Sequence, residues 1–106
     1  MLEGTAAQLQ MVEGDYGIAL PFTFTGIEFS ENDCMKFTFK KYPNGYTILE
    51  KVFENITNNT IQLEFTEQES MLFTSGNYVF SLDWYQNDSF LGNIINNGSF
   101  KVVDKV

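Results

Sequence analysis

The stretch from Thr66 to Tyr85, TEQESMLFTSGNYVFSLDWY, changes its hydrophobic period partway and so limits the folds open to this chain. In its second half, large apolar residues recur on one parity, which holds Tyr78, Phe80, Leu82 and Trp84. Successive side chains of a strand point to opposite faces, so this pattern predicts an amphipathic strand that delivers four large groups to one face. The stretch indicates how the chain folds and contains no catalytic device.

A helix start precedes this strand. The Thr66 side chain can accept a hydrogen bond from the backbone N–H of Glu69, whose carboxylate can reach back, as in a capping box. The pair Ser75-Gly76 predicts that the helix ends within about two turns. The order Ser75-Gly76-x-Tyr78 resembles the tyrosine corner of Greek-key sandwiches, in which a Tyr hydroxyl bonds to the backbone. We therefore expect structural roles for Thr66, Glu69, Gly76 and Tyr78.

Short alternating segments bounded by turn residues fill the rest of the chain. The expected strands cover residues 7–13, 18–25, 35–40, 46–56, 61–65, 77–85, 89–95 and 99–103. Seven or eight strands with turn signals roughly every 8–12 residues, plus one helical turn, are typical of an all-β, immunoglobulin-like antiparallel sandwich. We expect one such domain over residues 1–106.

Several local features are predicted within this scheme. Residues 1–6 form a loose terminus. Pro21 lacks an N–H and marks an edge strand or a bulge. A bulge near Glu50-Lys51 reconciles two competing parities. The Asn44-Gly45 pair tolerates positive φ in a hairpin turn, and a further turn covers residues 96–98.

Four N-x-[ST] sequons begin at Asn55, Asn58, Asn87 and Asn97. The chain opens with MLEGTAAQLQ, which has neither a cationic start nor an apolar run and does not resemble a signal peptide. We therefore interpret the four sequons as turn residues rather than as glycosylation acceptors.

The composition is acidic, with 14 Asp and Glu against 6 Lys and Arg, a formal net charge of −8. Nucleic acids and anionic membranes attract cationic surfaces, so neither is an expected partner. No segment approaches the roughly 20 apolar residues of a membrane span. The single cysteine, Cys34, excludes an intramolecular disulfide. We expect the chain to be made and folded in a reducing cytoplasm.

Catalytic chemistry has little support. The chain contains no His, which removes the commonest general base and the Ser-His and Cys-His nucleophile pairs. We interpret Cys34 as a packing residue. The carboxylates of Glu64, Glu67 and Glu69 cluster in sequence, but a solvated acidic edge with Glu69 as a cap accounts for them better than a glycosidase pair. We expect no enzyme and no cofactor.

Two binding chemistries remain as alternatives. Calcium prefers oxygen ligands, and a set for it exists in Asp83, Asn87, Asp88 and Asn93, although the spacing matches no EF-hand. Surface aromatics can stack on sugar rings. Candidates for such a platform are Tyr16, Tyr42, Tyr46, Trp84 and Tyr85. Trp84 shares the parity of the core residues and is expected inside. Of the four tyrosines, we choose Tyr42, Tyr46 and Tyr85 as the expected sugar or partner contacts.

Four passages resemble the small β-sandwich domains of phage and prophage tail modules, typified by the N-terminal domain of baseplate upper proteins. They are Glu13-Gly14-Asp15, DCMKFTFK (33–40), FTEQESMLFTSGNY (65–78) and NGSFKV (97–102). Together they span nearly the whole chain. The third departs from the family pattern, because Gln68-Glu69-Ser70 stands where an acidic-Thr pair is usual.

This resemblance implies a virion structural role. Such domains attach to other tail proteins and usually precede a fibre or receptor-binding region, so the chain is either a stand-alone relative or part of a longer protein. The family brings no catalytic residues. The expected partners are other tail or baseplate proteins, or further copies of this chain.

Docking of this kind uses an open strand edge or an apolar patch with a polar rim. We expect another chain to approach at the strand 7–13 and at the edge strand marked by Pro21. The alternative functions are a carbohydrate-binding module and a surface adhesin of immunoglobulin type.

Overall fold

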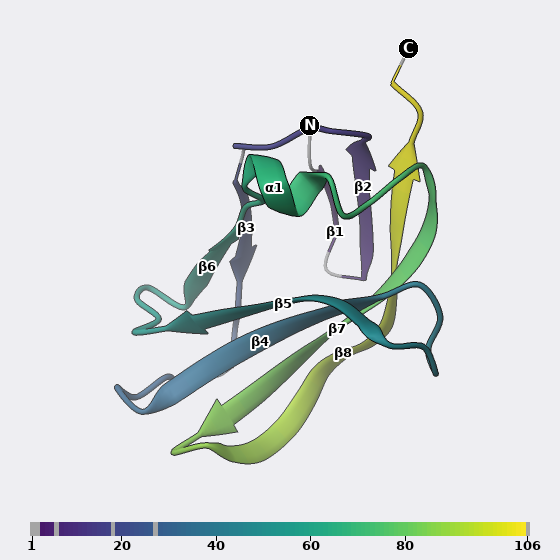
Figure 1. Ribbon diagram of the computed structural model, residues 1–106. Helices are drawn as coiled ribbons and strands as arrows, with labels where there is room; N and C mark the ends of the chain where they lie inside the picture. Colours follow the sequence, from purple (N-terminus) through teal and green to yellow (C-terminus); the bar gives the residue numbers. More distant parts are fainter. Residues whose placement is uncertain (1–2, 6, 18, 27, 106) are drawn as a thin grey trace.

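The computed structural model describes residues 3–5, 7–17, 19–26 and 28–105, which form two sheets and one short helix (Figure 1). The strands are β1 (Glu3–Thr5), β2 (Gln8–Val12), β3 (Leu20–Thr23), β4 (Asp33–Lys40), β5 (Thr47–Glu54), β6 (Thr60–Leu63), β7 (Gly76–Gln86) and β8 (Ser89–Val103). The helix α1 covers Glu67–Ser70. The predicted all-β class is confirmed.

The larger sheet has six strands in the order β1-β2-β8-β7-β4-β5. Its members pair antiparallel except for β2 and β8, which run parallel with Leu9 opposite Phe100 and Met11 opposite Val102. A purely antiparallel arrangement was therefore the wrong expectation. Hydrophobic alternation determines which face of a strand is buried, but it does not indicate which other strand pairs with it. Here the early strand β2 pairs with the last strand, β8.

The smaller sheet consists of β3 and β6 alone and lies against the inner face of the curled larger sheet (Figure 1). Aromatic rings join the layers, since Phe22 of β3 lies edge-on to Phe37 of β4 with ring centroids 5.2 Å apart. Phe65, just after β6, contacts Phe39 at 5.5 Å. The core between the layers holds Leu9, Met11, Phe22, Met35, Phe37, Phe39, Ile61, Leu63, Phe65, Phe73, Tyr78, Phe80, Leu82, Ile95, Phe100 and Val102.

Two strand boundaries differ from the prediction. Residues 3–5 form β1 rather than a loose terminus, because they pair with β2; residues 1, 2 and 6 lie outside the described part, as does Ile18 at the start of the predicted strand 18–25. The expected strands 89–95 and 99–103 are one strand, β8. Its register against β7 shifts at three places, so extra residues bend the strand without ending it.

The predicted turn at 96–98 is one of these irregularities. Phe80 faces Gly98 while Leu82 faces Ile95, so two residues of β8 lie opposite Ser81. The other misplaced irregularity is in β5, where Phe39 faces Leu49 and Lys40 faces Thr47. The extra residue is therefore Ile48, and not Glu50 or Lys51.

The asparagines of the sequons adopt the left-handed conformation that turn residues use, although Asn97 does so at the irregularity within β8 rather than in a turn. Asn55, Asn58, Asn87 and Asn97 have φ between 50° and 55°. Asn tolerates this left-handed region better than most residues. The Asn44-Gly45 pair does not adopt positive φ. Gly45 N–H instead donates to the Tyr42 carbonyl at 2.9 Å, which closes a turn with Pro43 and Asn44 at its centre.

Candidate interaction surface

The strand edges of the two sheets are the first candidates for a docking surface. The larger sheet ends at β1 and β5, and both strands of the smaller sheet have one unpaired side. β2 is not an edge, because β1 covers one side and β8 the other. Edge pairing of another chain, one of the two docking modes expected at 7–13, is therefore contradicted at Gln8–Gln10, which have a strand on both sides. Pro21 lies on an edge as predicted, opposite Gln62 and exposed.

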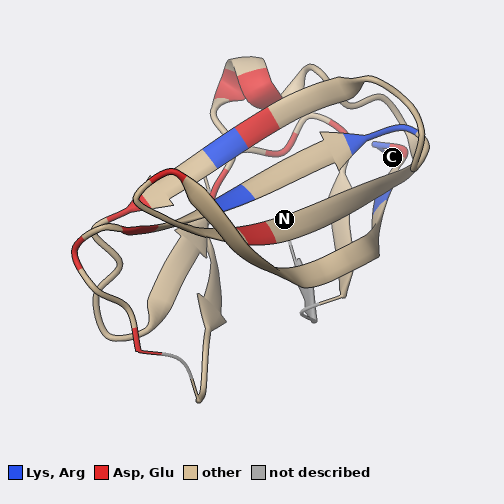
Figure 2. Ribbon diagram, turned by 90° about the horizontal axis from the view of Figure 1, so that it is seen from below, with Lys and Arg blue, Asp and Glu red and all other residues tan. Residues whose placement is uncertain are grey.

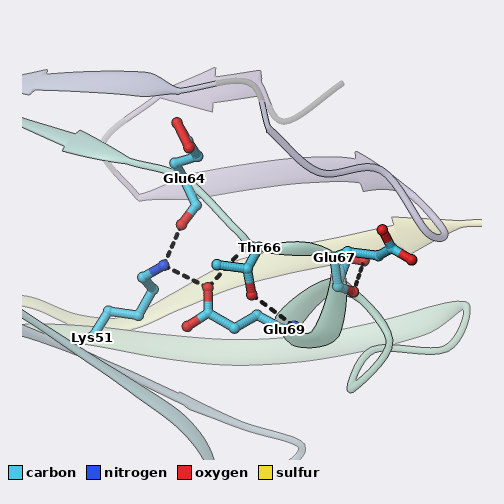
Figure 3. Close-up of polar contacts among 6 residues, drawn as sticks. Lys51, Glu64, Thr66, Glu67 and Glu69 are labelled. Carbon is cyan, nitrogen blue, oxygen red and sulfur yellow. Dashed lines mark hydrogen bonds and ion pairs between the residues drawn. The ribbon is translucent and has the colours of Figure 1, made fainter.

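A polar link occupies the gap between β5 and the segment after β6 (Figure 3). Lys51 Nζ lies 2.6 Å from Glu69 Oε1 and donates a second bond to the backbone carbonyl of Glu64. The lysine has the same parity as Leu49 and Phe53, so it is an inward-pointing charge on an edge strand. Such charges disfavour the addition of a foreign strand. The β5 side is therefore the less open of the edges.

The predicted capping box anchors this link. Glu69 N–H donates to Thr66 Oγ1 at 3.2 Å, and Thr66 N–H donates to Glu69 Oε1 at 2.9 Å. Burial alone would raise the pKa of Glu69, but hydrogen bonds from Lys51 and Thr66 outweigh it and lower the pKa below its ordinary value. The helix ends at Ser70, with Met71 as its C-cap, before Ser75-Gly76, which the sequence had assigned as its stop.

The residues around Tyr78 form a second structural anchor. The Tyr78 hydroxyl donates to the Thr74 carbonyl at 2.8 Å, the bond expected of a tyrosine corner. Gly76 begins β7 with φ of 147°, a conformation that favours glycine. Ser75 N–H donates to Glu13 Oε2 at 2.7 Å, which ties this loop to the end of β2.

The three tyrosines predicted as contacts are not brought together. Tyr42 and Tyr46 flank the β4–β5 turn and are 65% and 83% exposed. Tyr85 faces Cys34 near the opposite end of β4, roughly 20 Å away at the usual rise per residue. It is half-buried between the Lys36 ammonium, 5.2 Å from its ring centre, and the Phe90 ring at 5.7 Å. Trp84 packs against Phe29 and is partly buried.

The remaining sequence candidates have structural partners or lie apart. Asp83 Oδ1 accepts a bond of 2.6 Å from Asn93 Nδ2, whereas Asn87 and Asp88 lie at the β7–β8 turn. Within residues 3–5, 7–17, 19–26 and 28–105, no cluster of three or more His, Cys, Asp or Glu could hold a metal ion. Tyr16 is 54% exposed in the loop before β3.

Sequence reasoning missed a surface at the end of the larger sheet where β4 begins. Figure 2 shows acidic positions gathering there. Four carboxylates, those of Glu31, Asp33, Glu54 and Asp88, line one open hollow. They come from three separate segments, so no single stretch of sequence reveals them. The exposed side chains of Phe90 and Leu91 begin β8 beside this hollow.

Comparison with known proteins adds no relative. No protein-family profile matches the chain, and no curated protein or solved structure shows significant similarity to it. The single helix in the described part of the chain has four residues, and it is not long and apolar enough to cross a membrane.

Proposed function

We propose that this chain is a non-enzymatic structural protein of a phage or prophage tail or baseplate, which docks on partner subunits in the virion. The proposal rests on one observation: the four family-like passages lie around the strand β7. β4 pairs with β7, and residues 99–102 of β8 pair with the beginning of β7. Glu13 binds the loop that enters β7. Passages that recur together in a family are expected to contact one another.

The immunoglobulin-like sandwich belongs to the same proposal. Its support is the pair of facing sheets, with aromatic rings interlocked between them, and the hydrogen bond from Tyr78 to the backbone upstream. The parallel pairing of β2 with β8 is compatible with a sandwich whose first strand adds to the sheet of the last.

The docking edge favoured by the geometry is β3. Among the described residues it pairs only with β6, and Pro21 and Thr23 are exposed on its outer parity. A partner strand added here would pair with the backbone groups on the free side of β3. The Lys51 link leaves β5 less accessible, so we propose β3 as the site, where Pro21 contributes a carbonyl but no N–H to a partner strand.

The test is fractionation of tail particles from the encoding bacterium after prophage induction, with the protein detected by mass spectrometry. We expect it to co-migrate with tails in a density gradient. Hydrogen exchange should then show the amides of Leu20, Phe22 and Thr23 protected in the particle and less protected in the free protein; Pro21 has no amide hydrogen. Recovery of the protein solely at the top of the gradient, beside intact tails, would overturn the proposal.

A second function, carbohydrate binding, is favoured by one observation. A polar hollow of about 130 Å³ lies beside the β4–β5 turn and is lined by Pro43, Lys40, Ser81, Asn96 and Asn97. Its amide, hydroxyl and ammonium groups suit sugar hydroxyls, and the exposed rings of Tyr42 and Tyr46 flank the same turn. A glycan array, followed by titration of any hit with Tyr46→Ala as comparison, tests it; an array without hits contradicts it.

A further inference from the structure

The acidic hollow lies where three turns meet at the end of the larger sheet. Cys34, early in β4, faces Glu54 on one side and Tyr85 on the other. Asn87 N–H donates to the Asn32 carbonyl at 3.1 Å, which joins the β7–β8 turn to the segment before β4. The resulting hollow measures about 250 Å³ and is open to solvent. Its walls are therefore fixed by the sheet, although its residues are far apart in sequence.

Three of the four carboxylates are available to a partner. Asp33 is buried and accepts bonds from Ser30 N–H at 3.0 Å and Ser30 Oγ at 3.2 Å, so its role is structural. The side chains of Glu31, Glu54 and Asp88 are exposed, and no described residue donates a hydrogen bond or an ion pair to them. Lys36 lies two residues after Cys34 on β4. Its ammonium lies over the Tyr85 ring.

Two exposed apolar side chains follow Asp88, a lining residue of the hollow, at the start of β8. Phe90 and Leu91 are 58% and 47% exposed. Phe90 lies opposite Tyr85, while Leu91 is the extra residue at the register shift between Trp84 and Tyr85 and has no partner of its own in the pairing. Exposed large apolar groups rimmed by charge are typical of protein-binding surfaces. We call Glu31, Glu54, Asp88, Phe90 and Leu91 the acidic tip.

Charge complementarity selects the occupant. A second copy of the chain would bring its own carboxylates against these in a symmetric contact, and like charges placed together disfavour association. Free cations are small and do not use the apolar side chains. We infer that the acidic tip binds a segment of a partner protein in which Lys or Arg side chains flank an exposed apolar side chain. This inference rests on the docking role proposed above and specifies the partner's chemistry.

The test uses a dye-labelled synthetic peptide with a Leu-Phe pair flanked on each side by two lysines, titrated with the full-length protein and followed by fluorescence anisotropy. The wild-type protein should bind it, with affinity falling as salt rises. A matched peptide with Gln for every Lys should bind about tenfold more weakly. Equal binding of the two peptides, or absence of binding by both, would overturn the inference.

Protein variants localise the interaction. Glu54→Gln combined with Asp88→Asn should weaken peptide binding about fivefold, and Asn is compatible with the positive φ of residue 88. Glu50→Gln combined with Glu67→Gln is the control, because it also removes two exposed charges, both outside the hollow. Its effect should stay within about twofold; an effect equal to that of Glu54→Gln with Asp88→Asn would show diffuse attraction and contradict a defined site.

The apolar half has its own pair of variants. Phe90→Ser should weaken binding about fivefold, whereas Met71→Ser, at a more exposed apolar residue at the end of α1, should not. Circular dichroism and denaturation verify that each variant is folded. Because these titrations use the isolated protein, the inference can fail while the protein still co-migrates with tails, and it can hold when the protein does not.

Discussion

At the scale of single residues, Gly98 is the described glycine at which an added Cβ would meet another atom at the shortest distance. A Cβ built there would lie 2.6 Å from Cε1 of the buried Phe80 ring. We expect Gly98→Ala to destabilise the protein by about 1–3 kcal/mol, because the ring cannot move within a packed core. Gly92→Ala in the same strand is the control, since nothing lies within 4 Å of its added Cβ. Urea denaturation of both variants measures the difference; equal stabilities would refute this account.

The pKa of the Cys34 thiol depends on the charges around it. Burial raises the pKa of Cys34, and the carboxylates of Glu54, Asp88 and Asp33 raise it further, while Lys36 acts in the opposite direction. The reactive thiolate is thus scarce at neutral pH. We expect alkylation slower than that of a free cysteine, and faster in Glu54→Gln than in wild type across a pH series. A rate unchanged by that substitution would show that Glu54 does not act on the thiol.

The contribution of the Tyr78 hydroxyl to stability can be tested by removing its oxygen atom. Tyr78→Phe deletes the bond to the Thr74 carbonyl and leaves the ring between Phe73 and Phe100. We expect a loss of about 1 kcal/mol in the free energy of unfolding. Tyr46→Phe, at a ring that is 83% exposed, should change stability little. Thermal or urea denaturation distinguishes the two, and similar losses would assign the effect to something other than this bond.

At the scale of elements, Lys51 joins the edge strand β5 to the start of α1. The folded-state pKa of Glu69 is below its ordinary value, so the link stabilises the protein fully above the unfolded pKa and loses its effect as pH falls through the folded value. Glu69→Gln retains the capping geometry but removes the charge. The stability difference between wild type and this variant should be largest near pH 7 and shrink below about pH 4.

Urea denaturation at several pH values measures this difference, and Glu67→Gln, in the same turn but outside the link, is the control. A difference that stays constant between pH 7 and pH 3 would mean that the charge of Glu69 does not act through Lys51. If the stability difference from wild type shrinks equally with falling pH in Glu69→Gln and Glu67→Gln, the cause is the overall negative charge of the protein and not the Lys51 link.

The elements also show how far sequence reasoning reaches. Alternation located β4 and β7 correctly, because their inward residues, such as Phe37 and Phe80, are large and their outward neighbours polar. The capping box was readable since both partners lie within four residues. The bent course of β8 was not, because Asn96 and Asn97 signal a turn equally well whether the strand ends or bulges.

At the scale of the whole molecule, what escaped prediction is what depends on distant pairings. The acidic tip combines Glu31, Glu54 and Asp88 from three turns, and each alone resembles any solvated carboxylate. The parallel union of β2 with β8 joins residues near both ends of the chain. Neither local propensity nor periodicity determines such juxtapositions, which follow from the order of strands in the sheet.

The last prediction concerns the parallel pairing of β2 with β8. Leu9 and Met11 of β2 are buried against the rest of the core, and β2 is the only described strand that pairs with the far side of β8. Removing residues 1–13 should therefore expose Phe100 and Val102 and abolish cooperative unfolding. Removing residues 1–5 takes away β1 alone and should leave a cooperative transition, because β1 pairs only with β2. Denaturation followed by tryptophan fluorescence compares the two truncations. A cooperative transition in the longer one would show that the β7-centred sheet is stable without its parallel strand, and the region 1–13 could then serve docking rather than folding.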